Sequence, residues 1–473
     1  MKRELIVDCR SGGMRAAVLE DGELVELHME GGEPDRQTET LYYGRIQAVR
    51  PSVHAAFVEI GQELNASLPL EDGVKLKSGD MLIVQGVAKQ TTQSKGLRVS
   101  TRINLTGRAL VLIPSETGVH ISKKVKNPET RARLAAIGRA ICPPDCAIII
   151  RTASENVSAE QLQAEAEMLL KSWQETNQRA KGMVKPGVLT KPEPLSLRLT
   201  RDLAGNLERV VINDGDEFDA LCQAQKDGRL PLQTHIEYAD EQKTLLFDAF
   251  NLETPIDKAL KKRVWLPCGG LIFDFAEALT VIDVNSGKMV TGKSMEETAL
   301  RVNLEAVKEL ARQLRLRDVG GIVIVDLIDM EKDKNRQAVL AALKDAVKSD
   351  RMPVKIEGIT RLGLLEMTRK RKGEQLRRAL RTTCGVCSGS GELLCEEEIA
   401  RRALRQARRM ALAGQRVRNL SGRKSGKGSG GNAPAEKLPA CLRAGLRRIP
   451  RKIQRHTAGR GRNSRAGGSA PNE

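Results

Sequence analysis

Three polar side chains stand in or at the end of two apolar runs within residues 279–330, and their types suit a metal ion that works on phosphates. Asp283 and Asn285 lie two positions apart in the run VIDVN, so in a strand both point to the same face. Asp326 ends the apolar run GIVIVD. Magnesium typically takes one or two protein carboxylates and completes its shell with water and substrate phosphate. The pattern favours a metal-assisted phosphodiester hydrolase, although acids at strand ends also cap helices or form ion pairs.

An amphipathic helix must connect these two runs. Ser294 and Glu297 have the spacing of a capping box, and apolar residues recur at helical spacing in the residues that follow. The unbroken apolar run 321–326 predicts a strand buried on both faces, as in a parallel sheet. Ligands of such βαβ units sit at the carboxyl ends of the strands, where Asp283 and Asp326 are expected.

Cys384 and Cys387 form a CxxC pair followed by small residues, which favours zinc because a tight turn can point both sulfurs at one ion. Zinc needs four ligands, and no histidine or second cysteine pair lies close by in the sequence. Half a site suggests that a second copy of the chain supplies the other half across a two-fold axis. The alternatives are a redox CxxC or two unrelated buried thiols.

Nine cysteines without a secretory signal favour a reducing compartment. The N-terminal residues MKRELIVDC lack an apolar core of signal length, and no run reaches the roughly 20 apolar residues of a membrane helix. We therefore expect a cytoplasmic protein without a transmembrane segment.

The net charge of +18 points to a polyanionic partner, and most of it lies near the C-terminus. Residues 416–473 contain fifteen Lys and Arg against two Glu, a net +13, which leaves +5 for the preceding residues. This tail is rich in Gly, Ser, Asn and Arg, which predicts disorder because it cannot bury enough apolar surface. It would attract polyanions such as RNA, and the alternative is a solvated extension without a role.

Four motifs resemble the catalytic core of the ribonuclease E/G family: VIDVNSGK, EETALRVNLEAVKELARQLRLRDVGGIVIVDLIDM, RLGLLEMTRKR and CGVCSGSG. The resemblance runs from Met1 to about Gln415. It implies a magnesium-dependent endonuclease that cuts single-stranded RNA, is stimulated by a 5′-monophosphate end, and acts in rRNA maturation and mRNA decay. Because the chain ends soon after these motifs, without the long degradosome scaffold of ribonuclease E, we expect the architecture of the ribonuclease G branch.

The resemblance also assigns the metal sites. In that family the carboxylates of VIDVN and VDLIDM bind magnesium, which implies Asp283 and Asp326 as ligands and Asn285 as the residue that orients the attack. Cys384 and Cys387 match the family's zinc link, in which two protomers share one ion. The implied assembly is a homodimer or homotetramer that binds single-stranded RNA.

Residues 37–105 contain five short strand-like runs, which predict a small barrel and resemble the family's S1-type OB-fold. Phe57 and Lys95 match the family's RNA-binding phenylalanine and lysine. Ser67 stands where a second aromatic residue is expected, which should cost about 1–3 kcal/mol of stacking for one base. Taken without the family match, Phe57 is more readily interpreted as a core residue.

Residues 106–194 resemble the family's 5′ sensor, and Gly107, Val111, Arg151 and Thr152 match its phosphate-holding residues. Arg suits a terminal phosphate because it donates two charge-assisted hydrogen bonds. The alternative is that Arg151 pairs with a local acid such as Glu155.

The family sensor also receives a basic residue from the catalytic domain. Pro353 stands at that position in this chain, and Arg351, two residues earlier, is a candidate substitute. The departure puts the strength of 5′ sensing in question.

The expected fold is a multidomain α/β protein. Its parts, in chain order, are residues 1–36 as the first part of an RNase H-like domain, 37–105 as the S1-type OB-fold barrel, 106–194 as the 5′-sensor region, 195–263 as the second part of the RNase H-like domain, 264–380 as a DNase I-like catalytic domain, 381–392 as the zinc link, 393–415 as a small helical oligomerisation region and 416–473 as the disordered basic tail.

Two rival functions remain at this level. A non-catalytic RNA-binding or ribosome-assembly protein would keep the barrel and the tail, but the intact set Asp283, Asn285 and Asp326 argues against it. A DNA nuclease would fit a DNase I-like domain, but the S1-type barrel argues for RNA.

Overall fold

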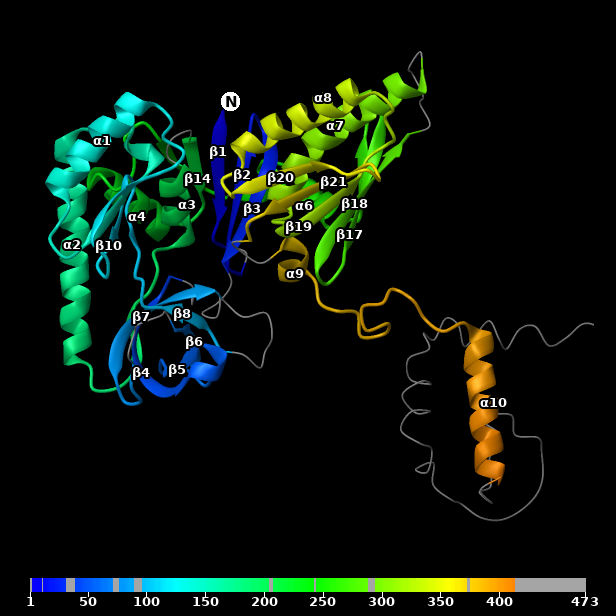
Figure 1. Ribbon diagram of the computed structural model, residues 1–473, viewed down its shortest axis with the longest axis horizontal. Coiled ribbons are helices and arrows are strands. Elements are labelled where there is room, and N and C mark those ends of the chain that lie inside the picture. Colours follow the sequence, from blue (N-terminus) through cyan, green and yellow to red (C-terminus); the bar gives the residue numbers. More distant parts are fainter. Residues whose placement is uncertain are drawn as a thin grey trace, which may run out of the picture. The chain divides into compact units, whose positions relative to one another are not determined.

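The computed structural model describes residues 2–10, 12–30, 39–70, 76–88, 96–203, 207–241, 244–287, 294–371 and 375–412. The chain divides into two compact units, Met1–Ala379 and Leu380–Glu473. The described part of the first unit contains four sheets (Figure 1). Lys95 and the tail 416–473 lie outside the described residues, so the RNA-binding and disorder expectations for them stay predictions.

The first sheet combines strands from two separated parts of the sequence. Its order is β15–β14–β1–β2–β3, with β1 parallel to β14 and antiparallel to β2. Side chains of β1 alternate between two cores, Leu5 and Val7 in one and Ile6 in the other, so both faces of the sheet are covered. The elements are β1 (Arg3–Asp8), β2 (Met14–Glu20), β3 (Glu23–Glu30), β14 (Leu207–Ile212), β15 (His235–Tyr238), α3 (Leu195–Leu203), α4 (Gly215–Lys226), α5 (Leu246–Ala249) and α6 (Glu253–Leu260).

The second sheet closes into a five-stranded, OB-like barrel, which confirms the expected small barrel. Its order is β4–β5–β6–β8–β7, and β7 pairs back onto β4. The interior is apolar, with Ile46, Val58 and Val99 fully or almost fully buried. The elements are β4 (Leu41–Arg50), β5 (Ala55–Glu59), β6 (Ala66–Pro69), β7 (Met81–Ala88), β8 (Arg98–Ser100) and β13 (Gly187–Thr190), which extends the sheet beside β4.

The third sheet is small and has two helices packed on it. Its order is β11–β12–β10–β9. Helix α2 extends from this sheet to the barrel, where Ala180 packs with Leu41 and Leu189 (Figure 1). The elements are β9 (Leu105–Thr106), β10 (Leu110–Ile113), β11 (Gly118–Ile121), β12 (Ala147–Ile150), α1 (Pro128–Ile141) and α2 (Ala159–Gly182).

The fourth sheet has the order β16–β17–β18–β19–β21–β20 and contains the predicted βαβ unit. Strands β18 and β19 run parallel, and helix α7, capped by Ser294, connects them. Helices α7 and α8 both pack on one face (Figure 1). The elements are β16 (Arg263–Leu266), β17 (Gly269–Phe275), β18 (Leu279–Ser286), β19 (Gly321–Asp326), β20 (Val354–Ile359), β21 (Leu364–Arg369), α7 (Met295–Leu316) and α8 (Asp333–Ala346).

The expectation that β19 is buried on both faces is wrong. Val323 and Val325 are buried under the helices, whereas Ile322 on the opposite face is 49% exposed. The helices of this unit cover a single face, so an apolar side chain on the other face stays accessible. We call the face opposite α7 and α8 the open face.

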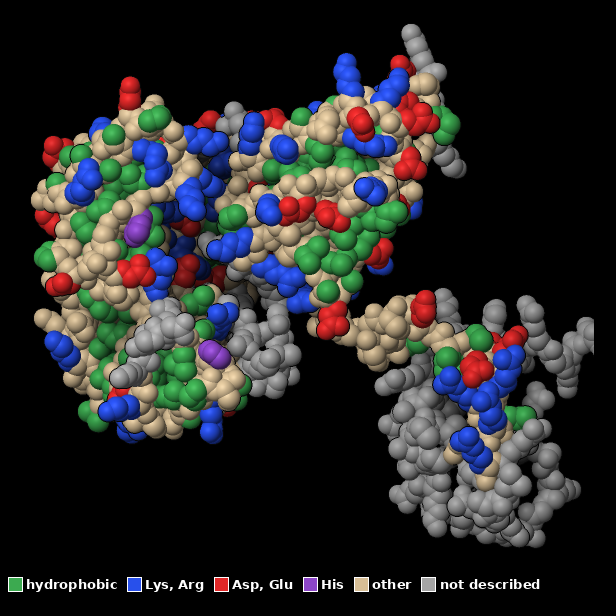
Figure 2. All heavy atoms as spheres, viewed as in Figure 1, with side chains coloured by type: hydrophobic (Ala, Val, Ile, Leu, Met, Phe, Trp, Pro, Cys, Tyr) green, Lys and Arg blue, Asp and Glu red, His purple; other side chains and the backbone are tan. Residues whose placement is uncertain are grey.

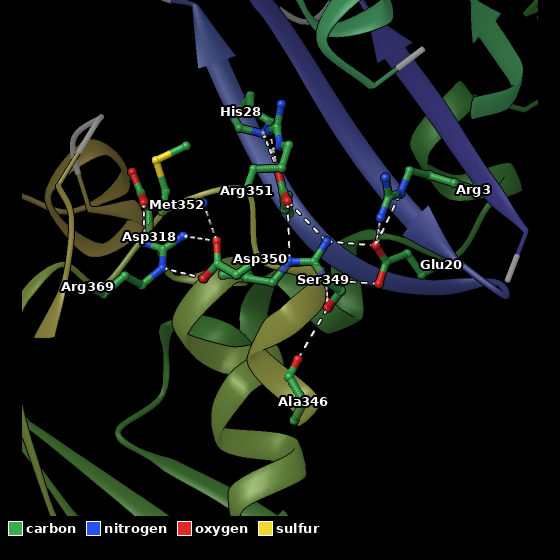
Figure 3. A network of polar contacts seen from close by, with 12 residues as sticks. Arg3, Glu20, His28, Asp318, Ala346, Ser349, Asp350, Arg351, Met352 and Arg369 are labelled. Atoms are coloured by element: carbon green, nitrogen blue, oxygen red, sulfur yellow. Dashed lines mark hydrogen bonds and ion pairs between the residues drawn. The ribbon is translucent and has the colours of Figure 1, made fainter. Parts of the chain in front are cut away.

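A buried network of ion pairs connects the first sheet to the fourth (Figure 3). Arg315 of α7 donates to Glu20 of β2 at 2.8 Å and to Glu26 of β3 at 3.1 Å. Arg351 donates to the other oxygen of Glu26 at 2.5 Å, and Arg3 binds Glu20 from the same sheet. Because removal of one partner of a buried pair leaves an uncompensated charge, the network makes the relative placement of the two sheets costly to change.

The second unit contains an isolated helix, α10 (Glu396–Leu412), as far as it is described, and α9 (Leu376–Leu380) lies at the boundary between the units. The first turn of α10 is acidic and arginines follow in later turns, an order that complements the helix dipole. The expected helical run after Glu396 is confirmed up to Leu412. In the described part of the chain, none of the helices combines the length and the hydropathy required to cross a bilayer.

Candidate active site and nucleic-acid interface

The predicted carboxylates lie side by side on the open face of the fourth sheet. Asp283 of β18 and Asp326 of β19 are register partners in the parallel pair. Their neighbours Ile282 and Val325 are buried below, so both carboxylates point away from the core. Asp283 is half-buried and Asp326 is exposed. Two accessible carboxylates on adjacent strands match the donor set that magnesium takes from proteins.

Asn285 lies two residues beyond Asp283 on the same face, as the alternation predicted. Its amide Nδ2 donates to Asp283 Oδ2 at 2.5 Å. This hydrogen bond fixes the orientation of one carboxylate and leaves the amide oxygen available.

The loop that follows Asp326 is held by two side chains of α7 that the sequence interpretation missed. Asn303, fully buried, donates to the Ile328 carbonyl at 2.8 Å and accepts from the Ile328 N–H at 3.0 Å. Glu296 accepts from the Glu331 and Lys332 N–H groups, and these bonds, that to Glu331 first, lower its carboxyl pKa. The sequence did contain a signal for this contact. Asn303 stands on the apolar face of the predicted helix, and a buried amide needs hydrogen-bond partners.

A shallow polar pocket continues from the end of β19. It is lined by the loop 327–330, by Arg336 of α8 and by the turn 359–363 between β20 and β21. Arg336 donates to the Met330 carbonyl, which fixes the pocket wall. The pocket thus begins one residue beyond Asp326 and has two arginines, Arg336 and Arg361, in its lining.

The barrel presents Phe57 on its outer surface, where it is 38% exposed. The core interpretation of Phe57 is therefore wrong, because its strand neighbours Ala56 and Val58 fill the interior instead. Phe57 pairs in register with Ser67, and Ser67 pairs with Arg98. Arg98, exposed and unassigned from the sequence, thus places a cation beside the serine that replaces the expected aromatic residue.

The expected sensor residues come together at the edge of the third sheet. Arg151 donates to the Gly107 carbonyl at 2.7 Å, and Val111 pairs with Thr106 next to Gly107. Thr152 Oγ1 lies 3.2 Å from Ser122 Oγ. A Cβ at Gly107 would lie 2.1 Å from Glu165 Oε1, so a larger residue there would displace the Glu165 carboxylate from the Ala109 N–H that it binds.

Arg151 has an ion-pair partner that the sequence did not suggest. Its guanidinium donates to Asp202 Oδ1 at 2.7 Å, with both side chains partly exposed. The ion pair therefore differs from the suggested one with Glu155, whose backbone carbonyl accepts from Arg133. Asp202 holds the guanidinium at the surface where a phosphate could reach it.

The suggestion that Arg351 substitutes at Pro353 is not supported by its contacts. Its guanidinium is bound to Glu26 and lies 3.2 Å from His28, both on β3. Lys124, beside the sensor, instead reaches the Arg351 carbonyl at 3.4 Å, and its N–H donates to Ser122 Oγ. Lys124 and Arg131, which both contact Ser122, are therefore cations that the third sheet's own region places beside the sensor.

Cys384 and Cys387 lie in a turn of the second unit, both as free thiols. Hydrogen bonds from backbone N–H groups, that of Gly391 first, lower the pKa of the Cys387 thiol. Among the described residues no group of three or more His, Cys, Asp or Glu side chains is arranged to hold a metal. Two thiols per chain fit half of a tetrahedral zinc site.

An OB-like barrel with an exposed aromatic residue and a sheet with paired accessible carboxylates favour an enzyme that processes nucleic acids. Residues 104–372, more than half of the chain, match the model of the Ribonuclease E/G family. The chain is 36% identical to "Ribonuclease G" of Haemophilus influenzae, over 85% of this chain and 86% of that protein. It is 32% identical to "Ribonuclease G" of Escherichia coli K12, over 86% and 87%, and 34% identical to "Ribonuclease E" of Nostoc sp. PCC 7120, over 80% and 57%.

The chain belongs to the ribonuclease E/G family and is an endoribonuclease.

Proposed function

We propose that this ribonuclease hydrolyses single-stranded RNA with the help of magnesium held by Asp283 and Asp326. The observation that carries the proposal is their register pairing on the open face of two parallel strands. Magnesium bound there would act as a Lewis acid on the phosphate and lower the pKa of a water molecule.

The side chains around this pair have distinct parts in the proposal. Asn285 orients the Asp283 carboxylate through its 2.5 Å hydrogen bond and offers its amide oxygen to a ligand or water. Asn303 keeps the loop after Asp326 in place. The RNA strand lies on the barrel against Phe57, with Arg98 and, outside the described residues, Lys95 contributing charge.

We propose that Arg151 and Thr152 bind a 5′-monophosphate and so stimulate cleavage. The surface position of the Arg151 guanidinium and the neighbouring Ser122 and Thr152 hydroxyls support this. Lys124 supplies the positive charge that a basic residue would provide at the position of Pro353. An incoming phosphate must compete with Asp202 for Arg151, so the stimulation should be moderate.

We further propose that Cys384 and Cys387 of two protomers share one zinc ion, giving a homodimer or homotetramer. The lowered Cys387 pKa favours the thiolate, which is the form that binds metal. From the resemblance to the ribonuclease E/G family, the physiological substrates that we propose are rRNA precursors and mRNA.

The test compares one short A/U-rich RNA carrying a 5′-monophosphate or a 5′-hydroxyl, first with magnesium and then with EDTA. We expect magnesium-dependent cleavage that is faster on the monophosphate. Equal rates on the two RNAs would refute the sensor and retain the nuclease. Binding of both RNAs with no cleavage in magnesium would favour the non-catalytic RNA-binding function.

A further inference from the structure

Trp265 is an exposed aromatic residue in a chain that has few. The sequence contains two Trp, three Tyr and six Phe among 473 residues. Among the described residues, the exposed aromatic side chains are Phe57 at 38%, Tyr238 at 40% and Trp265 at 74%. A large apolar side chain left this open to water is informative, because burial would stabilise the fold.

Trp265 shares the open face with the candidate catalytic residues. Its strand neighbours Val264 and Leu266 pack on the core under α7, so Trp265 must point the other way. In the ladder of strands, Trp265 pairs with Gly270, and Gly270 pairs with Asn285. The indole and the Asn285 amide therefore stand in one cross-strand row.

No side chain separates the two members of that row. Gly270 lies between them, and a Cβ there would meet the Val264 carbonyl at 2.9 Å and the indole Cε3 at 4.0 Å. Two strand spacings, about 10 Å, separate the backbone of Trp265 from that of Asn285. This span lets a base rest on the indole while a neighbouring phosphate reaches the carboxylates.

Arg263 stabilises the ring and adds positive charge. Its guanidinium lies 4.8 Å from the centroid of the indole ring, a cation–π contact. Arg263 pairs with Ile272, and Ile272 pairs with Asp283, so the next row of the open face runs from this guanidinium to the catalytic carboxylate. A cation and an aromatic ring together suit a nucleotide, one for the phosphate and one for the base.

Apolar side chains continue this surface. Hydrophobic side chains gather over the strands labelled β17 and β18 (Figure 2), and the exposed residues of the fourth sheet include Val281 and Ile322. An open face with carboxylates at one end and apolar groups around them favours flat bases over a purely ionic ligand.

We propose that Trp265 stacks against a base of the RNA next to the scissile phosphate, and that it supplies the second stacking surface that Ser67 does not provide on the barrel. The proposal rests on the catalytic role proposed for Asp283 and Asp326. It makes Trp265 an RNA-binding residue that selects where the strand lies on the sheet.

The first experiment measures cleavage by Trp265→Ala and Trp265→Phe in magnesium. The Ala variant should lose about ten-fold in kcat/KM, mainly through KM, because ten-fold lies within the range that one base stack contributes to binding. The Phe variant should retain most of the wild-type value. Leu232→Ala, at another highly exposed apolar side chain, is the control and should match wild type.

The position of the base is found with RNAs that carry one abasic site at successive positions around the cut. At one position, removal of the base should weaken RNA binding to the wild-type protein. The same abasic RNA should bind Trp265→Ala no more weakly than the intact RNA does. An equal additional loss at every position would overturn the proposal. So would an Ala variant that is monomeric where wild type is oligomeric, because the face would then be a contact between copies of the chain.

A second measurement separates this proposal from the catalytic assignment. In a Trp173→Phe background Trp265 is the sole tryptophan, and adding RNA in EDTA should quench its fluorescence. The quench should persist with Asp326→Asn even though cleavage stops. Unchanged fluorescence at saturating RNA would overturn the stacking role and leave the nuclease assignment intact.

Discussion

At the scale of single residues, local alternation within a strand was enough to predict which polar side chains share a face. The spacing of Asp283 and Asn285 fixed their common face, and the apolar run ending at Asp326 fixed the second carboxylate. Contacts between distant segments were not predictable. Arg151 meets Asp202, 51 positions away, and Arg351 meets Glu26, 325 positions away. No local pattern encodes such pairs, because they depend on how the sheets pack.

Arg151→Gln should abolish the preference for a 5′-monophosphate. The amide lacks the charge and the paired donors that bind a terminal phosphate, so the ratio of cleavage rates on 5′-monophosphate and 5′-hydroxyl RNA should fall to about one. The rate on the hydroxyl RNA should stay unchanged. Arg139→Gln, at an exposed cation on α1, is the control and should preserve the ratio. A preserved ratio in Arg151→Gln would exclude this residue from the sensor.

At the scale of elements, the sequence predicted the barrel and the βαβ unit but not the exposure of β19. An apolar run such as 321–326 is compatible with a strand covered on one face or on both. Which applies depends on where the helices pack, and α7 and α8 share one face. The sequence also gave no position for the first sheet relative to the fourth, which the buried ion network determines.

Asn303→Ala should destabilise the loop that follows Asp326. Removing the amide leaves the Ile328 N–H and carbonyl without their partner, at a cost of about 1–3 kcal/mol in the free energy of unfolding. Cleavage should fall more than RNA affinity, because the carboxylate position is disturbed and the barrel is not. Urea denaturation and single-turnover cleavage measure the two effects, with exposed Asn65→Ala as the control. Equal losses of affinity and rate would contradict the proposed part of Asn303.

Glu26→Gln should destabilise the protein at neutral pH. The change removes the counter-charge of Arg351 and leaves Arg315 with Glu20 alone, which costs about 3–5 kcal/mol. Glu237→Gln, in a more exposed pair with Arg209, should change stability by less than about 1 kcal/mol. Denaturation curves at pH 7 provide the comparison, and similar values for the two variants would show that the network contributes little.

The same network predicts a loss of stability in acid. Burial of Glu26 opposes its charge, but hydrogen bonding to His28 and the charges of Arg351 and Arg315 hold the pKa of Glu26 well below its ordinary value. A depressed carboxyl pKa contributes stability above the unfolded value of about 4.3, and this contribution is lost as pH falls through the folded pKa. As the pH falls from 7 to below the unfolded pKa, the free energy of unfolding of wild type should therefore decrease more than that of Glu26→Gln. Parallel losses would contradict the assignment.

At the scale of the whole molecule, the zinc site that we propose takes two thiols from each of two chains, so it would be complete only in an assembly. The double variant Cys384→Ser/Cys387→Ser should form a smaller assembly in solution than wild type and should bind no zinc. Wild type should contain one zinc ion per two chains. Light scattering with metal analysis measures both. Cys395→Ser, exposed in the same unit, should change neither. An unchanged mass in the double variant would show that other surfaces hold the protomers together.

We propose above that the paired carboxylates of the open face perform the hydrolysis. The most direct test is Asp326→Asn, measured for cleavage and for RNA affinity in magnesium, beside Asp274→Asn on the same sheet. Asp274 pairs with Lys262 and lies outside the carboxylate row, so its variant should cleave like wild type. Asp326→Asn should lose cleavage almost completely and bind RNA with near wild-type affinity. Retained cleavage, or a parallel loss of affinity, would contradict the account.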